Sequence, residues 1–215
     1  MLTRRFATEA IVLALLIVSS PTQGAIITFE FSGEVTFVQD YEGILGGKVS
    51  VGDSFAGTYT FDSTMPDTWP DDPNYGRYYS GASGMTFSVG DLELIAPGPN
   101  CAISIANRDN MDGFSIFAGG FASDGIQITE LPLNLYDTTA SVFSDDSLPL
   151  THPNINSFDQ RTINVQGVAL DNSNVRFRIE GVPISLTPEP DTILLLLLFG
   201  TLLLKHKPSR ANKAW

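Results

Sequence analysis

The fold is decided by the stretch Ile27-Thr28-Phe29-Glu30-Phe31-Ser32-Gly33-Glu34-Val35-Thr36-Phe37. Apolar side chains occupy every second position, with Gly33 in one of those places, and Thr, Glu and Ser fill the positions between. A period of two is that of a β-strand, in which successive side chains point to opposite faces. The pattern predicts a long strand with one buried face and one face in water, bent at Gly33.

The same alternation returns along the chain and predicts an all-β body. Residues 62–84 hold several Pro and Gly residues and are predicted to form a long loop. Gly181 and Pro183 are expected to end the last strand. Because no helical period with caps is found between residues 25 and 186, we expect an antiparallel β-sandwich or jelly roll. Further strands are predicted at 55–61, 85–89, 92–95, 101–106, 114–117, 126–128, 131–135, 142–143 and 175–179.

The charge of the body excludes several partners. The chain has 215 residues, with 12 basic and 24 acidic residues. Taking away the six basic and three acidic residues of the two ends leaves the body, 25–186, at −15. Such a body repels nucleic acid and anionic lipid and attracts divalent cations or basic surfaces. The single cysteine, Cys101, allows no intrachain disulfide, and its setting predicts a buried strand residue.

The N-terminus has the three parts of a secretory signal peptide. Arg4 and Arg5 form a positive region, and the apolar run 10–18 follows. Small residues then lead to Gly24. This order predicts a signal helix over residues 1–24 that is cleaved after Gly24.

The C-terminal residues 187–215 combine a short polar motif, an apolar run and a basic stop. The apolar run 193–204 would be roughly 18 Å long as a helix, against a hydrocarbon core of roughly 30 Å. Because the run is apolar on every face and lysines follow it, we expect a transmembrane helix rather than a buried core helix. The motif is Pro188-Glu189-Pro190; the helix includes Ile193, Leu198, Gly200 and Leu204; the basic stop is Lys205, Lys207 and Arg210.

This tail resembles the PEP-CTERM sorting signal of Gram-negative bacterial envelopes. The stretch 51–63 is also similar to one that is frequent in the ectodomains of that family. The resemblance implies that exosortase, a membrane-embedded transpeptidase-like enzyme, cuts the chain near Pro188-Glu189-Pro190. It also implies export across the inner membrane, followed by release or transfer of the body to the cell surface, in bacteria that often make exopolysaccharide.

Two loops of the body carry candidate binding residues. Trp69, Tyr75, Tyr78 and Tyr79 lie among polar residues, as sugar-ring stacking requires. The alternative is that these rings fold down and close one end of the body. The second loop offers hard oxygen ligands for calcium, although Asx-rich turns also form for backbone reasons alone. Its candidate ligands are Asn107, Asp109 and Asp112.

Catalytic signals are weak. His152 is the one histidine outside the tail and lies beside a proline, and no Gly-x-Ser-x-Gly motif is present. A glycoside hydrolase would need two carboxylates facing each other across a cleft, which the linear sequence does not pair. We therefore expect a non-catalytic structural or adhesive component of the envelope or matrix. The alternatives are a carbohydrate-binding module that uses the loop 69–79 and a glycoside hydrolase-like enzyme.

Overall fold

The computed structural model describes residues 24–79, 83–123 and 125–188. These ranges hold strands and two single-turn 3-10 helices, η1 (Gly98–Asn100) and η2 (Ile155–Ser157), and no α-helix. The strands are β1 (Ile26–Gln39), β2 (Ser54–Asp62), β3 (Tyr75–Tyr79), β4 (Gly84–Val89), β5 (Leu92–Ala96), β6 (Cys101–Arg108), β7 (Met111–Ala118), β8 (Phe121–Ser123), β9 (Ile126–Asp137), β10 (Gln160–Ala169) and β11 (Asn172–Pro188).

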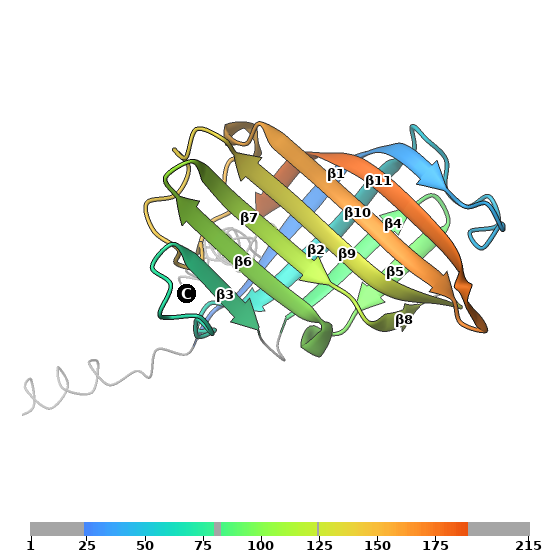
Figure 1. The fold of residues 1–215 in the computed structure, drawn as a ribbon, viewed down its shortest axis with the longest axis horizontal. Helices are drawn as coiled ribbons and strands as arrows, with labels where there is room; N and C mark the ends of the chain where they lie inside the picture. Colours follow the sequence, from blue (N-terminus) through green and yellow to red (C-terminus); the bar gives the residue numbers. More distant parts are fainter. Residues whose placement is uncertain (1–23, 80–82, 124, 189–215) are drawn as a thin grey trace, which may run out of the picture.

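All strands belong to one antiparallel sheet. Its order is β3-β6-β7-β9-β10-β11-β1-β2-β4-β5, and the short β8 pairs with β9 beyond the end of β7. Figure 1 shows that the sheet curls over, so that β3, β6, β7, β9 and β10 cross in front of β1, β2, β4 and β5. The prediction of an antiparallel all-β body is confirmed. The expected two sheets of a sandwich are instead two halves of one continuous sheet, which curls into a half-barrel.

The continuous sheet results from pairing between the two ends of the described chain. The first strand, β1, pairs with the last strand, β11, over most of its length, and with β2 on its other side. Two register shifts, between Ser32 and Gly33 and between Val35 and Phe37, interrupt the β1–β11 ladder. Bulges of this kind bend a strand and increase its local twist. The extra residues are Ile184 of β11 at the first shift and Thr36 of β1 at the second.

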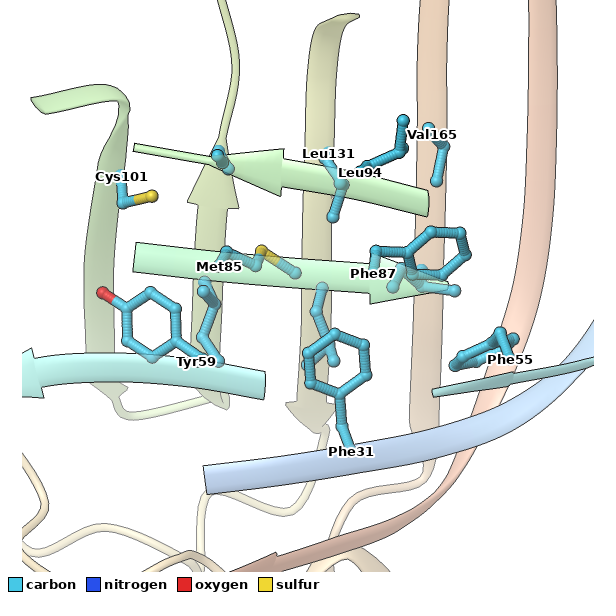
Figure 2. Packing of buried hydrophobic residues seen from close by; sticks show 14 of the residues in the cluster. Phe31, Phe55, Tyr59, Met85, Phe87, Leu94, Cys101, Leu131 and Val165 are labelled. Atoms are coloured by element: carbon cyan, nitrogen blue, oxygen red, sulfur yellow. The ribbon is translucent and has the colours of Figure 1, made fainter. Parts of the chain in front are cut away.

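The core fills the space inside the curled sheet. Its largest fully buried side chains are mostly aromatic, and Figure 2 shows rings from β1, β2 and β4 facing Leu131 and Val165 across the interior. Two glycines make room for two of these rings. Gly57 is paired with Phe31 and Gly33 with Phe55, and a Cβ on either glycine would collide with the ring of its partner. Each phenylalanine thus lies over the glycine of the neighbouring strand.

Cys101 and Tyr59 meet in this core (Figure 2). Cys101 is a free, buried strand residue, as the sequence predicts, and burial raises the pKa of its thiol to about 11. Burial, with a smaller contribution from Cys101, also raises the pKa of Tyr59. The Tyr59 hydroxyl is enclosed and has no hydrogen-bond partner among the described residues. The ring therefore packs well while its polar atom is left unsatisfied.

Three local predictions are wrong. Residues 62–84 are not all loop, because they contain β3. The last strand does not end at Gly181 or Pro183 but continues to Pro188. Beyond Gly181, β11 is paired with β1 alone, and a proline at such an edge costs no hydrogen bond. Residues 142–143 form no strand, since they belong to a loop whose backbone bonds to side chains.

The predicted signal peptide and most of the predicted sorting tail lie outside the described residues. Only Gly24 of the first and Thr187 and Pro188 of the second are described. Pro188 is paired with Phe29, so the sheet reaches the first residue of the Pro-Glu-Pro motif. Within the described part of the chain, no helix is long and apolar enough to cross a membrane.

A candidate ligand-binding face

β3 is the last strand at one end of the sheet, and its two edges have different neighbours. It pairs with β6 on one side, and the segment 67–69 covers its other side. The Thr68 amide donates to the Arg77 carbonyl at 2.8 Å. The Asp67 carboxylate accepts the amides of Trp69 and Arg77 at 2.9 and 2.8 Å. These bonds fix Trp69 beside the outward positions of the strand.

The outward side chains of β3 are Tyr75, Arg77 and Tyr79. The Arg77 guanidinium lies over Trp69 and Tyr79, 5.5 and 4.9 Å from the ring centroids. The rings of Trp69 and Tyr75 are 5.4 Å apart, and Arg108 lies 5.7 Å over Tyr75. We call these five residues the aromatic platform. Trp69 keeps 49% and Tyr79 44% of its surface exposed, so the platform offers ring surface to a ligand.

Small residues on β6 and β7 lie beside the platform. Ala102 and Ala106 pair with Tyr79 and Tyr75 and face outward, yet they are only 5% and 8% exposed. They are therefore covered by their neighbours on this face. A Cβ at Gly113, the next residue across from Ala106, would lie 3.1 Å from the ring of Tyr136. Aromatic side chains thus lie close to the sheet rather than standing away from it.

The three residue rows that cross this face contain no carboxylate. Acidic residues lie around the rows: Asp67, Asp71 and Asp72 in the loop before β3, Asp109 in the turn between β6 and β7, and the exposed Glu130 on β9, while Asp112 and Asp137 are buried. The rows are Tyr75–Ala106–Gly113–Tyr136, Arg77–Ser104–Ser115–Asn134 and Tyr79–Ala102–Phe117–Pro132.

Tyr78, the fourth predicted aromatic residue, lies on the inner face of β3. It is 5% exposed, and its hydroxyl donates to the Asp146 carbonyl at 2.8 Å. Burial, followed by the negative charges of Asp67, Asp146 and Asp145, raises the pKa of Tyr78 to about 12. Tyr78 therefore closes one end of the core and is not part of the platform.

The predicted calcium residues all lie on the hairpin between β6 and β7. Asn107 and Asp112 are a cross-strand pair, whereas Asp109 is exposed in the turn. One oxygen of Asp112 accepts the amides of Val142 and Phe143 at 2.7 and 2.8 Å, and the other is buried without a partner in the described part of the chain. Among the described residues, no three His, Cys, Asp or Glu side chains are grouped so that they could hold a metal ion.

A second buried aspartate, Asp137, pairs with Asp112 across β7 and β9 and was missed by the sequence reasoning. Its carboxylate accepts the amide and hydroxyl groups of Thr139 and Ser141. These bonds lower the pKa of Asp137 to about 2, and the bond from the Thr139 hydroxyl contributes most. Asp112 and Asp137 therefore fix the loop after β9 over the end of the core. The signal for this was the Asp-Thr-Thr sequence, a pattern that favours Asx turns.

Two surface hollows in the described part of the chain have different linings. The first, of about 470 Å³, lies over β11, β1, β2 and β4 and is lined largely by Ser and Thr, with Glu30 as its one carboxylate. The second, of about 490 Å³, lies around the loop after β1 and has Asp40 as its one carboxylate. The acid pair that glycoside hydrolysis requires is present in neither lining. The rings of His152 and Phe29 pack edge to face, with their centroids 6.4 Å apart.

No family model matches this chain, and no curated protein or solved structure was found to be similar to it.

Proposed function

We propose that this chain is an exported, non-catalytic component of the cell envelope or extracellular matrix of a Gram-negative bacterium. The support for export and sorting is in the sequence, at 1–24 and 187–215, and in the resemblance of the tail to PEP-CTERM signals. The last described strand reaches Pro188, the first residue of the Pro-Glu-Pro motif, at which we expect a processing enzyme of the exosortase type to act. Intact-mass analysis of the mature protein tests both ends, because a full-length mass would contradict the proposal.

In this setting the aromatic platform is a polysaccharide-binding surface. One observation carries this assignment: Trp69 and Tyr79 remain about half exposed while Arg77 lies against both rings. Exposed aromatic surface is costly unless it meets a ligand, and the apolar faces of sugar rings pack well on aromatic rings. Exopolysaccharide is therefore the partner that we propose.

The test is sedimentation of the mature protein with insoluble or gel-forming polysaccharides. Trp69→Ala combined with Tyr79→Ala should lower the bound fraction strongly without changing the melting temperature by more than a few degrees. Tyr41→Ala is the matched control, because Tyr41 is 84% exposed in a loop on another part of the surface. Retained binding in the double variant, or equal loss in the control, would contradict the platform as the binding surface.

A further inference from the structure

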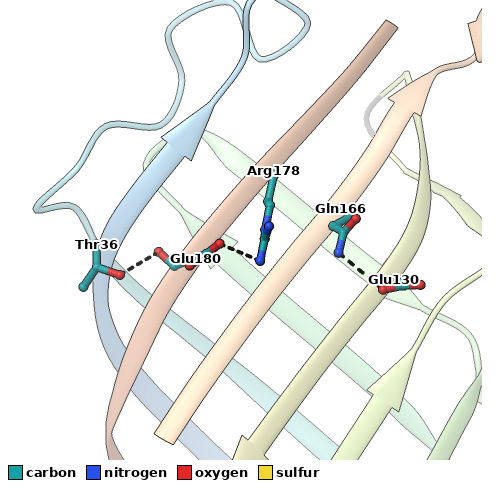
Figure 3. A network of polar contacts seen from close by, with 5 residues as sticks. All are labelled: Thr36, Glu130, Gln166, Arg178 and Glu180. Atoms are coloured by element: carbon teal, nitrogen blue, oxygen red, sulfur yellow. Dashed lines mark hydrogen bonds and ion pairs between the residues drawn. The ribbon is translucent and has the colours of Figure 1, made fainter. Parts of the chain in front are cut away.

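Two of the six basic residues of the body, Arg77 and Arg108, lie in the aromatic platform. In a body with 21 acidic residues, an arginine has many carboxylates with which it could form an ion pair. Arg178 has one: it bonds to Glu180 on the same strand at 2.7 Å (Figure 3). The other four arginines of the body form no ion pair with another described residue, and two of them, Arg77 and Arg108, lie against aromatic rings.

The partners of these two arginines are ring faces, which leave the positive charge in place. A cation–π contact uses the face of the guanidinium and not its N–H donors. The Arg77 Nε–H has no acceptor among the described residues. Because this Nε–H is buried, a ligand would have to bind the terminal NH2 groups of Arg77, for which no hydrogen bond to a described residue is found.

The nearby acidic residues are partly engaged elsewhere. The Asp67 carboxylate accepts the amides of Trp69 and Arg77, and that of Asp72 accepts the Asn74 amide at 3.0 Å. Asp71 and Asp109 are left at the rim. Arg77 is the one charged residue within the three rows of the face, and Arg108 adds a second guanidinium group beside Tyr75.

We infer that the aromatic platform selects polysaccharides that carry carboxylate groups. Aromatic rings stack on the sugar faces, and the guanidinium groups bind the uronate carboxylates, for which their planar donor array is suited. Tyr75 and Tyr79 are four residues apart on an extended strand, about 13 Å, with Arg77 midway. Ring, charge and ring thus follow one another along β3. This inference rests on the proposed polysaccharide-binding function and gives its substrate class.

The charge of the whole body opposes such a ligand, and distance decides which effect dominates. At physiological ionic strength the Debye length is about 8 Å, so charges on the far side of the molecule are screened. Contacts within the platform act at hydrogen-bond distance and are screened far less. Selectivity for carboxylates is therefore expected at physiological salt, where the long-range repulsion from the −15 body is screened more strongly than the contacts within the platform.

The experiment compares two polymers with the same sugar backbone: polygalacturonate and its fully methyl-esterified form, in which each carboxylate is replaced by an uncharged methyl ester. Binding of the mature protein, produced from the full-length chain, is measured at physiological salt with a chelator present, so that calcium cannot link protein to polymer. We expect the acid form to bind about tenfold more tightly, the effect of one charge-assisted hydrogen bond or more. Arg77→Gln and Arg108→Gln should each remove much of that difference. Arg176→Gln, on β11, is the matched control and should leave it unchanged.

The outcomes separate the two levels of the proposal. Equal binding of both polymers by the unmodified protein would overturn carboxylate selection while the platform stands. Binding of neither polymer, nor of any other polysaccharide, would overturn the binding function and this inference with it. Arg77→Lys keeps the charge and loses the planar fork, so retention of full selectivity in that variant would contradict the bidentate contact. The ester comparison needs no variant, and it decides the question even if a substitution prevents folding.

Discussion

Tyr78 and Tyr79 are neighbours in the chain with the same side chain, and the sheet gives them opposite roles. Tyr78 points into the curled sheet, where its ring is buried and its hydroxyl bonds to the loop carbonyl of Asp146. Tyr79 points outward, is 44% exposed and has Arg77 against its ring. One position along a strand therefore separates a residue that holds the fold from one that is available to a ligand.

The same contrast holds between the inner and outer faces of the sheet around β3, β6 and β7. On the inside, Tyr78, Asp112 and Asp137 hold the loop 138–148 over the end of the core. On the outside, the platform is attached to the sheet but nothing in the described structure covers it. Substitutions on the inner face should therefore change stability, and substitutions on the outer face should change binding.

The largest effect is expected from removing the inner tyrosine. Tyr78→Ala removes a buried ring and a buried hydrogen bond and should lower the free energy of unfolding by about 3–5 kcal/mol. Tyr79→Ala removes a half-exposed ring and should cost about 1 kcal/mol or less. Urea unfolding of the two variants measures this difference. Equal losses would show that the two faces of β3 are not distinct in the way described.

The next effect concerns the loop that Asp112 holds. Asp112→Ala leaves the amides of Val142 and Phe143 without their acceptor and should cost about 2–3 kcal/mol, with faster amide exchange in the loop. Asp109→Ala, in the exposed turn three residues earlier, should change stability by less than about 0.5 kcal/mol. If instead a calcium ion were held by these residues, adding calcium would raise the melting temperature and both variants would abolish that rise.

Two buried tyrosines offer a smaller and sharper test. No described residue bonds to the Tyr59 hydroxyl, whereas the Tyr78 hydroxyl donates to a carbonyl. Tyr59→Phe should therefore raise the free energy of unfolding by about 0–1 kcal/mol, and Tyr78→Phe should lower it by about 1 kcal/mol. The same unfolding measurement gives both values. A loss of stability in Tyr59→Phe would show that its hydroxyl has a partner, such as buried water.

The smallest effect is expected in acid. Hydrogen bonds from the loop lower the pKa of Asp137 from an ordinary value of 3.8 to about 2. Because the pKa is lower in the folded state, this carboxylate contributes stability above about pH 4 and loses it as the pH falls towards 2. Unfolding measured between pH 5 and pH 2 should show a flatter decline in Asp137→Asn than in the unmodified protein. Parallel declines would contradict the assignment.

The sequence was informative where alternation was complete. The strands β1, β2, β4 and β5 follow from apolar residues at every second position, and the hairpin at Gly90-Asp91 follows from its turn residues. β3 was missed because Gly76 occupies one of its inner positions, which removes an apolar residue from a very short pattern. The pairing of β3 with β6, and of β1 with β11, joins distant segments and has no local signal.

The candidate site was predicted in part for the same reason. Composition pointed to the aromatic residues 69–79, but only the register shows that Tyr78 faces inward. Arg108 was not expected there, because it comes from β6 and reaches Tyr75 across the strand pair. Without the pairing of the strands, no spacing in the sequence relates these residues.

Hydrogen–deuterium exchange of the mature protein, with and without a bound acidic polysaccharide, tests the central claim most directly. We predict that protection on binding is confined to the platform segments, residues 67–79 and 102–108, with β1 and β2 unchanged. Two results would contradict the account. One is protection centred on the Ser- and Thr-lined hollow over β1, β2 and β4. The other is a protein that binds no polysaccharide and shows no change in exchange anywhere.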